Sequence, residues 1–385
     1  MPWSETTRMD ERQRFIELLE SCRFTMTELC ESFGISRKTG YKWAERYVRE
    51  GVAGLEDRSR APKRCPHATE ARCVEALVEE RRRHPQWGPR KLLDRLRRRH
   101  PGWSWPAVST AGAILKRHGL VRPRRRRSGR RGPLAKPEIQ ASRPNDLWSA
   151  DYKGEFRLGD RRLCYPLTAM DHVSRYLLDC RARSSVAIAG AQPVFEALFR
   201  RFGLPRAILC DNGAPFASIQ SPRRLSRLSV WWVRLGIVPI FTQPGRPDQN
   251  GCHERMHKTL KAETARPPRA SFAAQQRRFD QFRHEYNTER PHETLEMDRP
   301  AEHYGPSPRT YPQTLPEPEY PGHYEVRIVR SKGSIRWRGR EVFCSQTLAH
   351  QPLGLEEVDD GLWSIYLADL LLGRYDERSG DTEWL

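Results

Sequence analysis

Three acidic residues occupy positions from which they could act on one substrate. Asp151 lies in LWSADYKG, which we expect to form a strand, and Asp211 follows the apolar run AILC directly before Asn212–Gly213. Glu254 follows the loop TQPGRPDQNG, where we expect a helix to begin. In open α/β sheets, strand ends and helix starts meet at one crevice. The three carboxylates are therefore candidates for a single site.

Carboxylates gathered in one crevice repel one another unless cations lie between them. Oxygen ligands favour Mg²⁺ or Mn²⁺, and two such ions ~3.5–4 Å apart can activate an attacking oxygen and stabilise the leaving oxygen of a phosphodiester. Each acid also has a structural alternative, because an aspartate before Asn-Gly is common in turns and a glutamate in a first helical turn complements the helix dipole. Asp171 in AMDHVSRY is equally conspicuous, and we expect it in a hairpin turn.

The elements that must position these acids are predicted in an α/β core at 145–305. Apolar periodicity predicts strands at 148–156, 163–170, 175–180, 207–209 and 237–241, and helices at 186–202, 225–235, 254–265 and 272–286. Three antiparallel strands before βα units indicate a mixed sheet with helices on both faces.

The flanking regions predict a multidomain chain. We expect an all-α helix-turn-helix domain at 1–60, a second helical domain at 67–120, a basic linker at 121–144 and, from alternating apolar residues between glycine turns, a small all-β barrel at 320–385.

Asp151 in WSADYKG, Asp211 in CDNGAPF and Glu254 in QPGRPDQNGCHERMHKTLKAE resemble the core motifs of DDE transposases of bacterial insertion sequences, which are relatives of retroviral integrases. FRHEYNTERPHETLEMDRPAEHY is similar to the closing helix of that family. The resemblance covers roughly residues 20–310, with several motifs in the right order. It implies an RNase H-like core, two Mg²⁺ or Mn²⁺ ions held by the three acids, and a homo-oligomer that holds two DNA ends.

Asp211 and Glu254 are separated by 42 residues, more than is usual in the family. We place the excess in SIQSPRRLSRLSV, where an insertion leaves the crevice intact but could alter target-DNA or subunit contacts.

The predicted helix after Glu254 carries further candidates. Lys258 and Lys261 lie on the same helical face as Glu254. The resemblance places such basic residues against the DNA end. The simpler alternative is a Glu254–Lys258 pair at i,i+4. His253 and His257 could approach the site, but we expect them to line the helix surface. Three more residues are expected to shape the site: Asn212, Asn250 and Gly251.

DNA recognition is predicted in the N-terminal helices. Residues 26–48 fit a helix-turn-helix, with Gly34 in the turn and Ser36 as N-cap of the second helix. Tyr41 could equally be a core residue. The predicted DNA contacts are Ser36, Arg37, Lys38, Thr39, Tyr41 and Lys42 here, and Arg90 and Lys91 in the second helical domain.

Composition agrees with a nucleic-acid partner. The formal net charge is +20, from 68 Lys and Arg against 48 Asp and Glu, and Arg makes up 58 of the cations. Arginine forks match phosphate oxygens, although a GC-rich coding genome gives the same bias. The linker at 121–137 has no acid, and we expect it to contact DNA through Arg124, Arg125, Arg126, Arg127, Arg130 and Arg131.

Other classes of protein are not favoured. No apolar run reaches the ~18–20 residues that cross a bilayer, and the N-terminus lacks a secretory pattern. Nine scattered cysteines predict reduced thiols, hence a cytoplasmic, nucleoid-associated protein without a membrane partner. A zinc site from Cys65, His67 and Cys73 has the wrong spacing.

The function predicted from the sequence is a DDE transposase. It cleaves at terminal repeats, and the freed 3′ hydroxyl then attacks target double-stranded DNA. Two alternatives remain open at this stage: a catalytically silent, domesticated DNA-binding regulator, and a nuclease of the same core fold that acts on RNA–DNA hybrids.

The basic linker gives a first prediction. Deleting residues 122–131 should flatten the salt dependence of DNA binding by about 0.9 in the log–log slope for each phosphate that the linker neutralises in the intact chain, while repeat preference is retained. Binding measured across a salt series checks this, and an unchanged slope would show that the arginine run does not bind phosphates.

Overall fold

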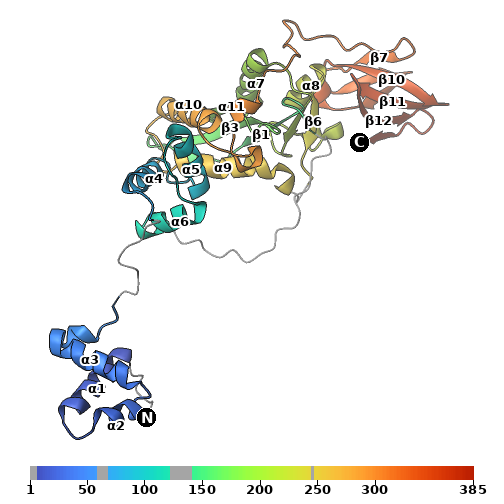
Figure 1. Ribbon diagram of the computed structural model, residues 1–385. Coiled ribbons are helices and arrows are strands. Elements are labelled where there is room, and N and C mark those ends of the chain that lie inside the picture. Colours follow the sequence, from blue (N-terminus) through green and yellow to red (C-terminus); the bar gives the residue numbers. More distant parts are fainter. Residues whose placement is uncertain (1–6, 59–67, 122–140, 244–246) are drawn as a thin grey trace. The chain divides into compact units, whose positions relative to one another are not determined.

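The computed structural model describes residues 7–58, 68–121, 141–243 and 247–385 (Figure 1). The chain divides into two units, Met1–Ala68 and Thr69–Leu385. No helix among the described residues is long and apolar enough to cross a membrane.

The first unit is a three-helix domain. Its helices are α1 (Arg8–Glu20), α2 (Met26–Ser32) and α3 (Arg37–Glu50). Gly34, with φ +62°, makes the turn between α2 and α3, and the Ser36 hydroxyl accepts a hydrogen bond from the Thr39 amide at the start of α3. Phe15, Leu29 and Trp43 are buried between the helices. The predicted helix-turn-helix is therefore present.

The second unit begins with another helical group. It consists of α4 (Ala71–Arg83), α5 (Pro89–Arg99) and α6 (Val108–Arg117). Proline stands at the first position of α5, where it costs no helical hydrogen bond. Trp87, Leu92 and Ile114 lie in the shared core of the three helices.

A mixed sheet forms the centre of the second unit. Its strands are β1 (Leu147–Tyr152), β2 (Phe156–Arg157), β3 (Leu163–Asp171), β4 (Leu177–Arg183), β5 (Ala207–Cys210) and β6 (Val238–Phe241). β1, β3 and β4 pair antiparallel, whereas β1–β5 and β5–β6 pair parallel. The mixed sheet predicted from the sequence is confirmed.

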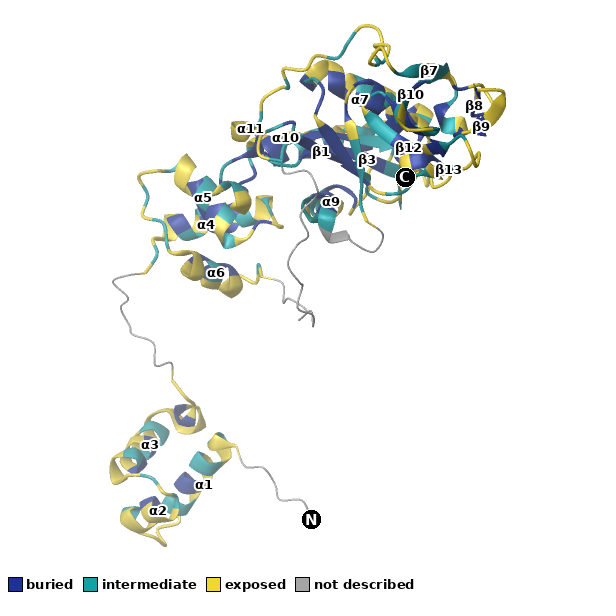
Figure 2. Cartoon of the chain, turned by 90° about the vertical axis from the view of Figure 1, so that its right-hand side faces the viewer, coloured by how far each residue is buried: buried dark blue, intermediate teal, exposed yellow. Residues whose placement is uncertain are grey.

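Helices cover both faces of this sheet. They are α7 (Ile188–Phe202), α8 (Arg227–Arg234), α9 (Gly251–Thr264), α10 (Phe272–Thr288) and the short α11 (Pro300–His303). Trp148 of β1 packs with α7 and α8, whereas Met170 of β3 packs with α9 and α10. Side chains of a strand alternate between faces, so both faces are apolar, and Figure 2 shows β1 and most of β3 in the buried colour.

The C-terminal region is all-β. Its strands are β7 (Glu325–Ile328), β8 (Ser334–Trp337), β9 (Arg340–Phe343), β10 (Pro352–Asp359), β11 (Leu362–Leu367), β12 (Leu370–Asp376) and β13 (Thr382–Trp384). They form an open five-stranded antiparallel sheet in the order β13-β12-β11-β10-β7 and a separate β8–β9 hairpin. The predicted barrel is not confirmed, because these sheets are not closed. Alternation of apolar residues predicts strands, but it does not determine whether the edge strands pair.

Residues 218–230, where the sequence analysis places the excess length between Asp211 and Glu254, connect the core to this C-terminal sheet. The Ser221 and Thr347 hydroxyls lie 2.7 Å apart, and the Arg223 guanidinium donates to the Leu371 carbonyl at 2.9 Å. Leu225 is fully buried in the apolar cluster of the C-terminal sheet. The segment therefore joins two parts of the second unit.

Leu225→Ala should lower the free energy of unfolding by roughly 2–5 kcal/mol, because it leaves a cavity in that cluster. Ile219, six residues earlier and 86% exposed, provides the matched control. Ile219→Ala should change the free energy by no more than about 0.5 kcal/mol. Urea unfolding of the full chain measures both, and equal effects would contradict the packing role of Leu225.

Candidate active site

Asp151 and Asp211 lie on neighbouring parallel strands. β1 and β5 pair with Ser149 opposite Leu209, and the same register continued by two residues places Asp151 beside Asp211, the residue directly after β5. The Gly213 amide donates to the Asp211 carboxylate at 3.2 Å. The two aspartates therefore lie side by side at the same edge of the sheet, as the sequence predicts.

Glu254 lies in the first turn of α9 and is exposed. Met256 and Leu260 of the same helix pack between β3, β4 and α10. This packing fixes which side of α9 faces the sheet and leaves Glu254 on the side open to solvent.

The three carboxylates affect one another electrostatically. Burial raises the pKa of Asp151 to about 7, and the negative charges of Asp211 and Glu254 add to this increase. Burial also raises the pKa of Asp211. Within the described part of the chain, no group of three or more His, Cys, Asp or Glu side chains is arranged so that it could hold a metal ion.

Asp171 has a structural role. It ends β3, is fully buried, and accepts hydrogen bonds from the Asn145 amide at 2.7 Å and from the Ser174 amide and hydroxyl at 2.7 and 2.6 Å. These bonds stabilise the turn between β3 and β4. Asp171 itself is the last residue of β3, directly before the turn in which the sequence predicts it.

His253 and His257 do not line the helix surface, so that expectation is wrong. Both rings are buried against the sheet, where they contact the hydroxyls of Ser149 and Thr168. Their spacing offered a signal, because positions 253, 256, 257 and 260 form one helical stripe with Met256 and Leu260. The polar residue type masked that stripe.

The two lysines after Glu254 are exposed on α9. Within the described residues, Glu254 and Lys258 form no ion pair, so the simpler i,i+4 alternative is not realised. Lys261 and Lys153 line a small hollow of about 20 Å³. A DNA contact by Lys258 and Lys261 stays a prediction.

Asn212 ties the loop after Asp211 to two other segments. Its side-chain amide donates to the Thr242 carbonyl at 2.5 Å, and its oxygen accepts from Arg224 at 2.8 Å. Asn250 is buried just before Gly251, where α9 begins, and its side-chain oxygen has no partner among the described residues. Asn212 thus holds the loop that follows Asp211, and its role in the site stays a prediction.

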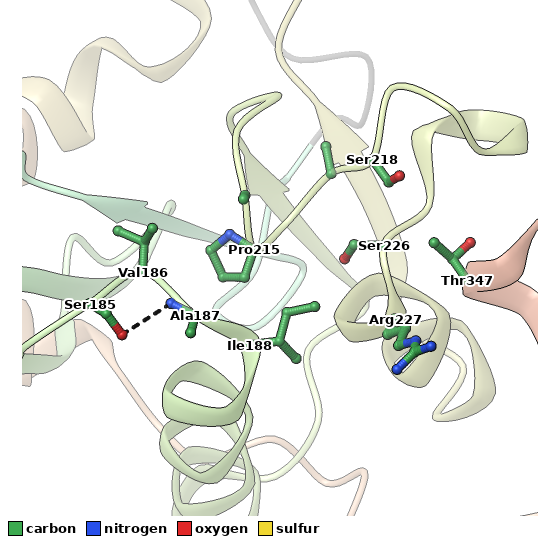
Figure 3. A pocket seen from close by; sticks show the side chains of 11 residues that line it. Ser185, Val186, Ala187, Ile188, Pro215, Ser218, Ser226, Arg227 and Thr347 are labelled. Carbon is green, nitrogen blue, oxygen red and sulfur yellow. Dashed lines mark hydrogen bonds between the residues drawn. The ribbon is translucent and has the colours of Figure 1, made fainter.

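A cleft of about 610 Å³ begins at the same loop (Figure 3). Its walls are residues 185–188, which lead into α7, the loop residues Ala214, Pro215, Ala217 and Ser218, then Ser226 and Arg227 at the start of α8, and Thr347. Hydroxyls and small apolar groups dominate the lining, and the three acids are not among the lining residues.

The start of α3, where the sequence predicts DNA contacts, is exposed, and the contacts themselves stay a prediction. Arg37, Lys38 and Lys42 are exposed, and Tyr41 is 60% exposed, so the core alternative for Tyr41 is wrong. Ser36 caps the helix, and the Lys42 ammonium also lies 4.2 Å from the Trp43 ring centroid.

The α5 helix lies against the core. Arg95 contacts Glu289 at 2.6 Å and Arg98 contacts Asp298 at 3.0 Å. Lys91 is partly buried there, and burial, followed by repulsion from Arg290, lowers its pKa to about 8. We therefore leave Lys91 out of the proposed DNA contacts, whereas the neighbouring Arg90 is exposed.

Two groups of predicted residues lie outside the described part of the chain. They are the linker arginines (Arg124, Arg125, Arg126, Arg127, Arg130 and Arg131) and the zinc candidates Cys65 and His67.

Comparison with known families decides the identity of the core. The family described as Integrase core domain matches residues 141–247, and a second Integrase core domain description matches 235–300. A Homeodomain-like domain matches 39–115 and a Helix-turn-helix domain matches 11–63. The chain is 29% identical over 256 residues to the insertion element IS476 uncharacterized 39.2 kDa protein of Xanthomonas euvesicatoria, covering 65% of this chain and 69% of the relative. The chain therefore contains integrase-core and helix-turn-helix domains and is similar to the proteins of bacterial insertion elements.

Other proteins are also similar to parts of this chain. The insertion element IS407 uncharacterized 31.7 kDa protein of Burkholderia multivorans is 28% identical over 47% of this chain and 63% of its own length. Among solved structures, a simian T-cell lymphotropic virus intasome chain is 16% identical, with a TM-score of 0.37, over 77% of this chain and 97% of that chain. The HTLV-2 integrase catalytic core domain in complex with magnesium is 14% identical, with a TM-score of 0.34, over 43% and 100%.

The α5 contacts predict opposite effects for the substitution of two arginines on this helix, Arg95 and Arg97. Arg95 pairs with Glu80 at 2.8 Å as well as with Glu289, and Glu80 is almost fully buried. Arg95→Ala should lower the free energy of unfolding by about 2 kcal/mol, below the usual cost of breaking a buried pair because Arg99 and His84 still face Glu80. Urea unfolding measures this loss.

Arg97, exposed on the same helix, is the matched control. Arg97→Ala should leave the stability unchanged and weaken binding to duplex DNA more than Arg95→Ala does. The reverse pattern would contradict the placement of α5 against the core.

Proposed function

We propose that this protein is a DDE transposase that cleaves DNA at the terminal repeats of its element and joins the freed 3′ hydroxyl to target DNA. The observation that carries the proposal is the β1–β5 register, which sets Asp151 beside Asp211 in an integrase core whose helix α9 carries Glu254 in its first turn.

We propose that these three carboxylates would hold two Mg²⁺ or Mn²⁺ ions. Their oxygen-only donor set suits these ions. The pKa of Asp151 is raised in part by Asp211 and Glu254, so bound cations would relieve the mutual repulsion. Asp211 and Glu254 are exposed, and packing does not block rotation of their side chains toward an ion. Such ions supply activation of the attacking oxygen and stabilisation of the leaving oxygen.

The chain's own residues would bind and orient the DNA. Lys258 and Lys261 lie on the exposed side of α9 with Glu254, where their ammonium groups can hold phosphates beside the scissile bond. Neither step needs a covalent intermediate with the protein. Water is the nucleophile in the cleavage step, and the 3′ hydroxyl is the nucleophile in the joining step. Residues at the start of α3 would read the repeat in a major groove: Arg37, Lys38, Thr39, Tyr41 and Lys42.

At least two copies of the chain would be needed to hold two DNA ends in one complex. We therefore propose a homo-oligomer assembled on double-stranded DNA. The exposed Arg90 and the linker arginines would add phosphate contacts without sequence preference.

The test is a strand-transfer assay with the DNA that flanks the gene, in Mg²⁺ or Mn²⁺. Wild type should give joined products, and Glu254→Gln should lower their yield at least about 10²-fold, because it keeps the shape of the side chain and removes a charge that would hold a metal. Asp160→Asn, in the exposed turn between β2 and β3, is the charge-matched control and should join normally.

Each other outcome has a distinct meaning. Repeat binding without joining in any variant would favour a DNA-binding regulator, and equal joining by wild type and Glu254→Gln would show that Glu254 is the wrong acid. Preference for an RNA–DNA hybrid over the repeat in competition binding would favour a nuclease.

A further inference from the structure

Four polar side chains are buried between the sheet and α9. Ser149 of β1 and Thr168 of β3 face His253 and His257 of α9, and none of the four is more than 4% exposed. Buried polar groups destabilise a fold unless they are hydrogen-bonded. The arrangement of protons in this cluster is therefore constrained.

The Thr168 hydroxyl is the centre of the cluster. It donates to the main-chain carbonyl of Asp151 at 3.0 Å, and it lies 2.7 Å from His253 Nε2 and 2.6 Å from His257 Nε2. A hydroxyl has one proton to donate and two lone pairs to accept with. Since its proton goes to Asp151, both histidines must donate to Thr168 from Nε2–H.

The remaining ring nitrogens follow from this assignment. Both rings are almost fully buried, where a positive charge is costly, so each ring carries one proton. His253 Nδ1 then accepts from the Ser149 hydroxyl at 2.7 Å, and the Met170 carbonyl lies farther from that hydroxyl, at 3.4 Å. His257 Nδ1 lies 3.5 Å from Asp151 Oδ2.

These bonds join the sheet, in which β1 carries Asp151, to α9, which carries Glu254. Glu254 directly follows His253 on α9, and Asp151 is both on β1 and opposite Thr168 in the β1–β3 pair. The N-cap residue Asn250 makes no side-chain capping bond to α9. The start of this helix is therefore attached to the sheet through its histidines.

We propose that Thr168 is a positioning residue, whose hydroxyl fixes His253 and His257 in the Nε2-protonated tautomer and thereby holds Glu254 in place relative to Asp151. This inference rests on the proposed function, since the relative position of the two acids matters only if they act together. The hydrogen-bond arrangement itself can be tested without any activity.

The first experiment is ¹⁵N NMR of the imidazole nitrogens in the full-length chain labelled at histidine, with resonances assigned by their disappearance in single His→Gln variants. Wild type should show neutral Nε2–H rings for both histidines. Ser149→Ala should shift the His253 resonances and leave those of His257 in place. An Nδ1–H or doubly protonated ring at either position in wild type would overturn the inference.

The second experiment compares strand-transfer rates of Thr168→Val and Thr168→Ser at saturating DNA. The valine variant keeps the shape but removes the hydroxyl, and should slow joining roughly 10²-fold, the size of effect expected from misplacing a reacting group by about 1 Å. Its affinity for DNA should not change, and the serine variant should restore most of the rate. Thr288→Val, at the exposed end of α10, is the matched control and should join normally.

The outcomes separate this inference from the proposed function. Nε2–H rings in a wild type that joins no DNA would refute the transposase proposal, and the hydrogen-bond arrangement would still hold. Normal joining by Thr168→Val would overturn the positioning role. If Thr168→Val does not fold, the wild-type tautomers and the effect of Ser149→Ala on His253 alone still decide the hydrogen-bond assignment.

Discussion

Burial of Asp151 beside two other carboxylates is unfavourable, and the integrase core is built so that the strands cannot relieve it by separating. Parallel pairing of β1 with β5 fixes Asp151 next to Asp211 through main-chain hydrogen bonds, which no side-chain rotation can undo. Glu254 is different, because it lies on a helix that is attached to the sheet only through side chains. The Ser149–Thr168–histidine cluster and the packing of Met256 supply that attachment. Repulsion within the site therefore persists, and cations are the groups best able to remove it.

The large positive charge of the chain has two uses that composition cannot separate. On α5, Arg95 and Arg98 are paired with acids of the core, so these guanidinium groups hold one part of the second unit to another. At the start of α3 and on the exposed side of α9, cations face solvent. Only the exposed cations can bind phosphate without first giving up a partner. Net charge thus overestimates the DNA-binding surface, and the ion pairs show which arginines to subtract.

The sequence predicts what depends on local pattern. The apolar runs before Asp151 and Asp211 give the buried strands, and residue order alone places Glu254 at a helix start. Contacts between distant segments could not be predicted: Lys91 lies in a cationic helix that the sequence presents as a DNA reader, yet it packs against residues about 200 positions away. His253 and His257 were missed for a different reason, because a stripe of buried residues is recognised by apolar types and these two are polar. The C-terminal strands were predicted, but strand closure depends on edge pairing, which alternation does not encode.

The extra length between Asp211 and Glu254 lies away from the acids but is not independent of them. Closing a longer loop costs little additional entropy, and the segment offsets that cost by burying Leu225 in the C-terminal cluster. In the same segment Arg224 donates to the side chain of Asn212, the residue next to Asp211, which in turn donates to the Thr242 carbonyl after β6. The loop that carries the second acid is therefore connected through one amide side chain to the segment on which the C-terminal sheet packs.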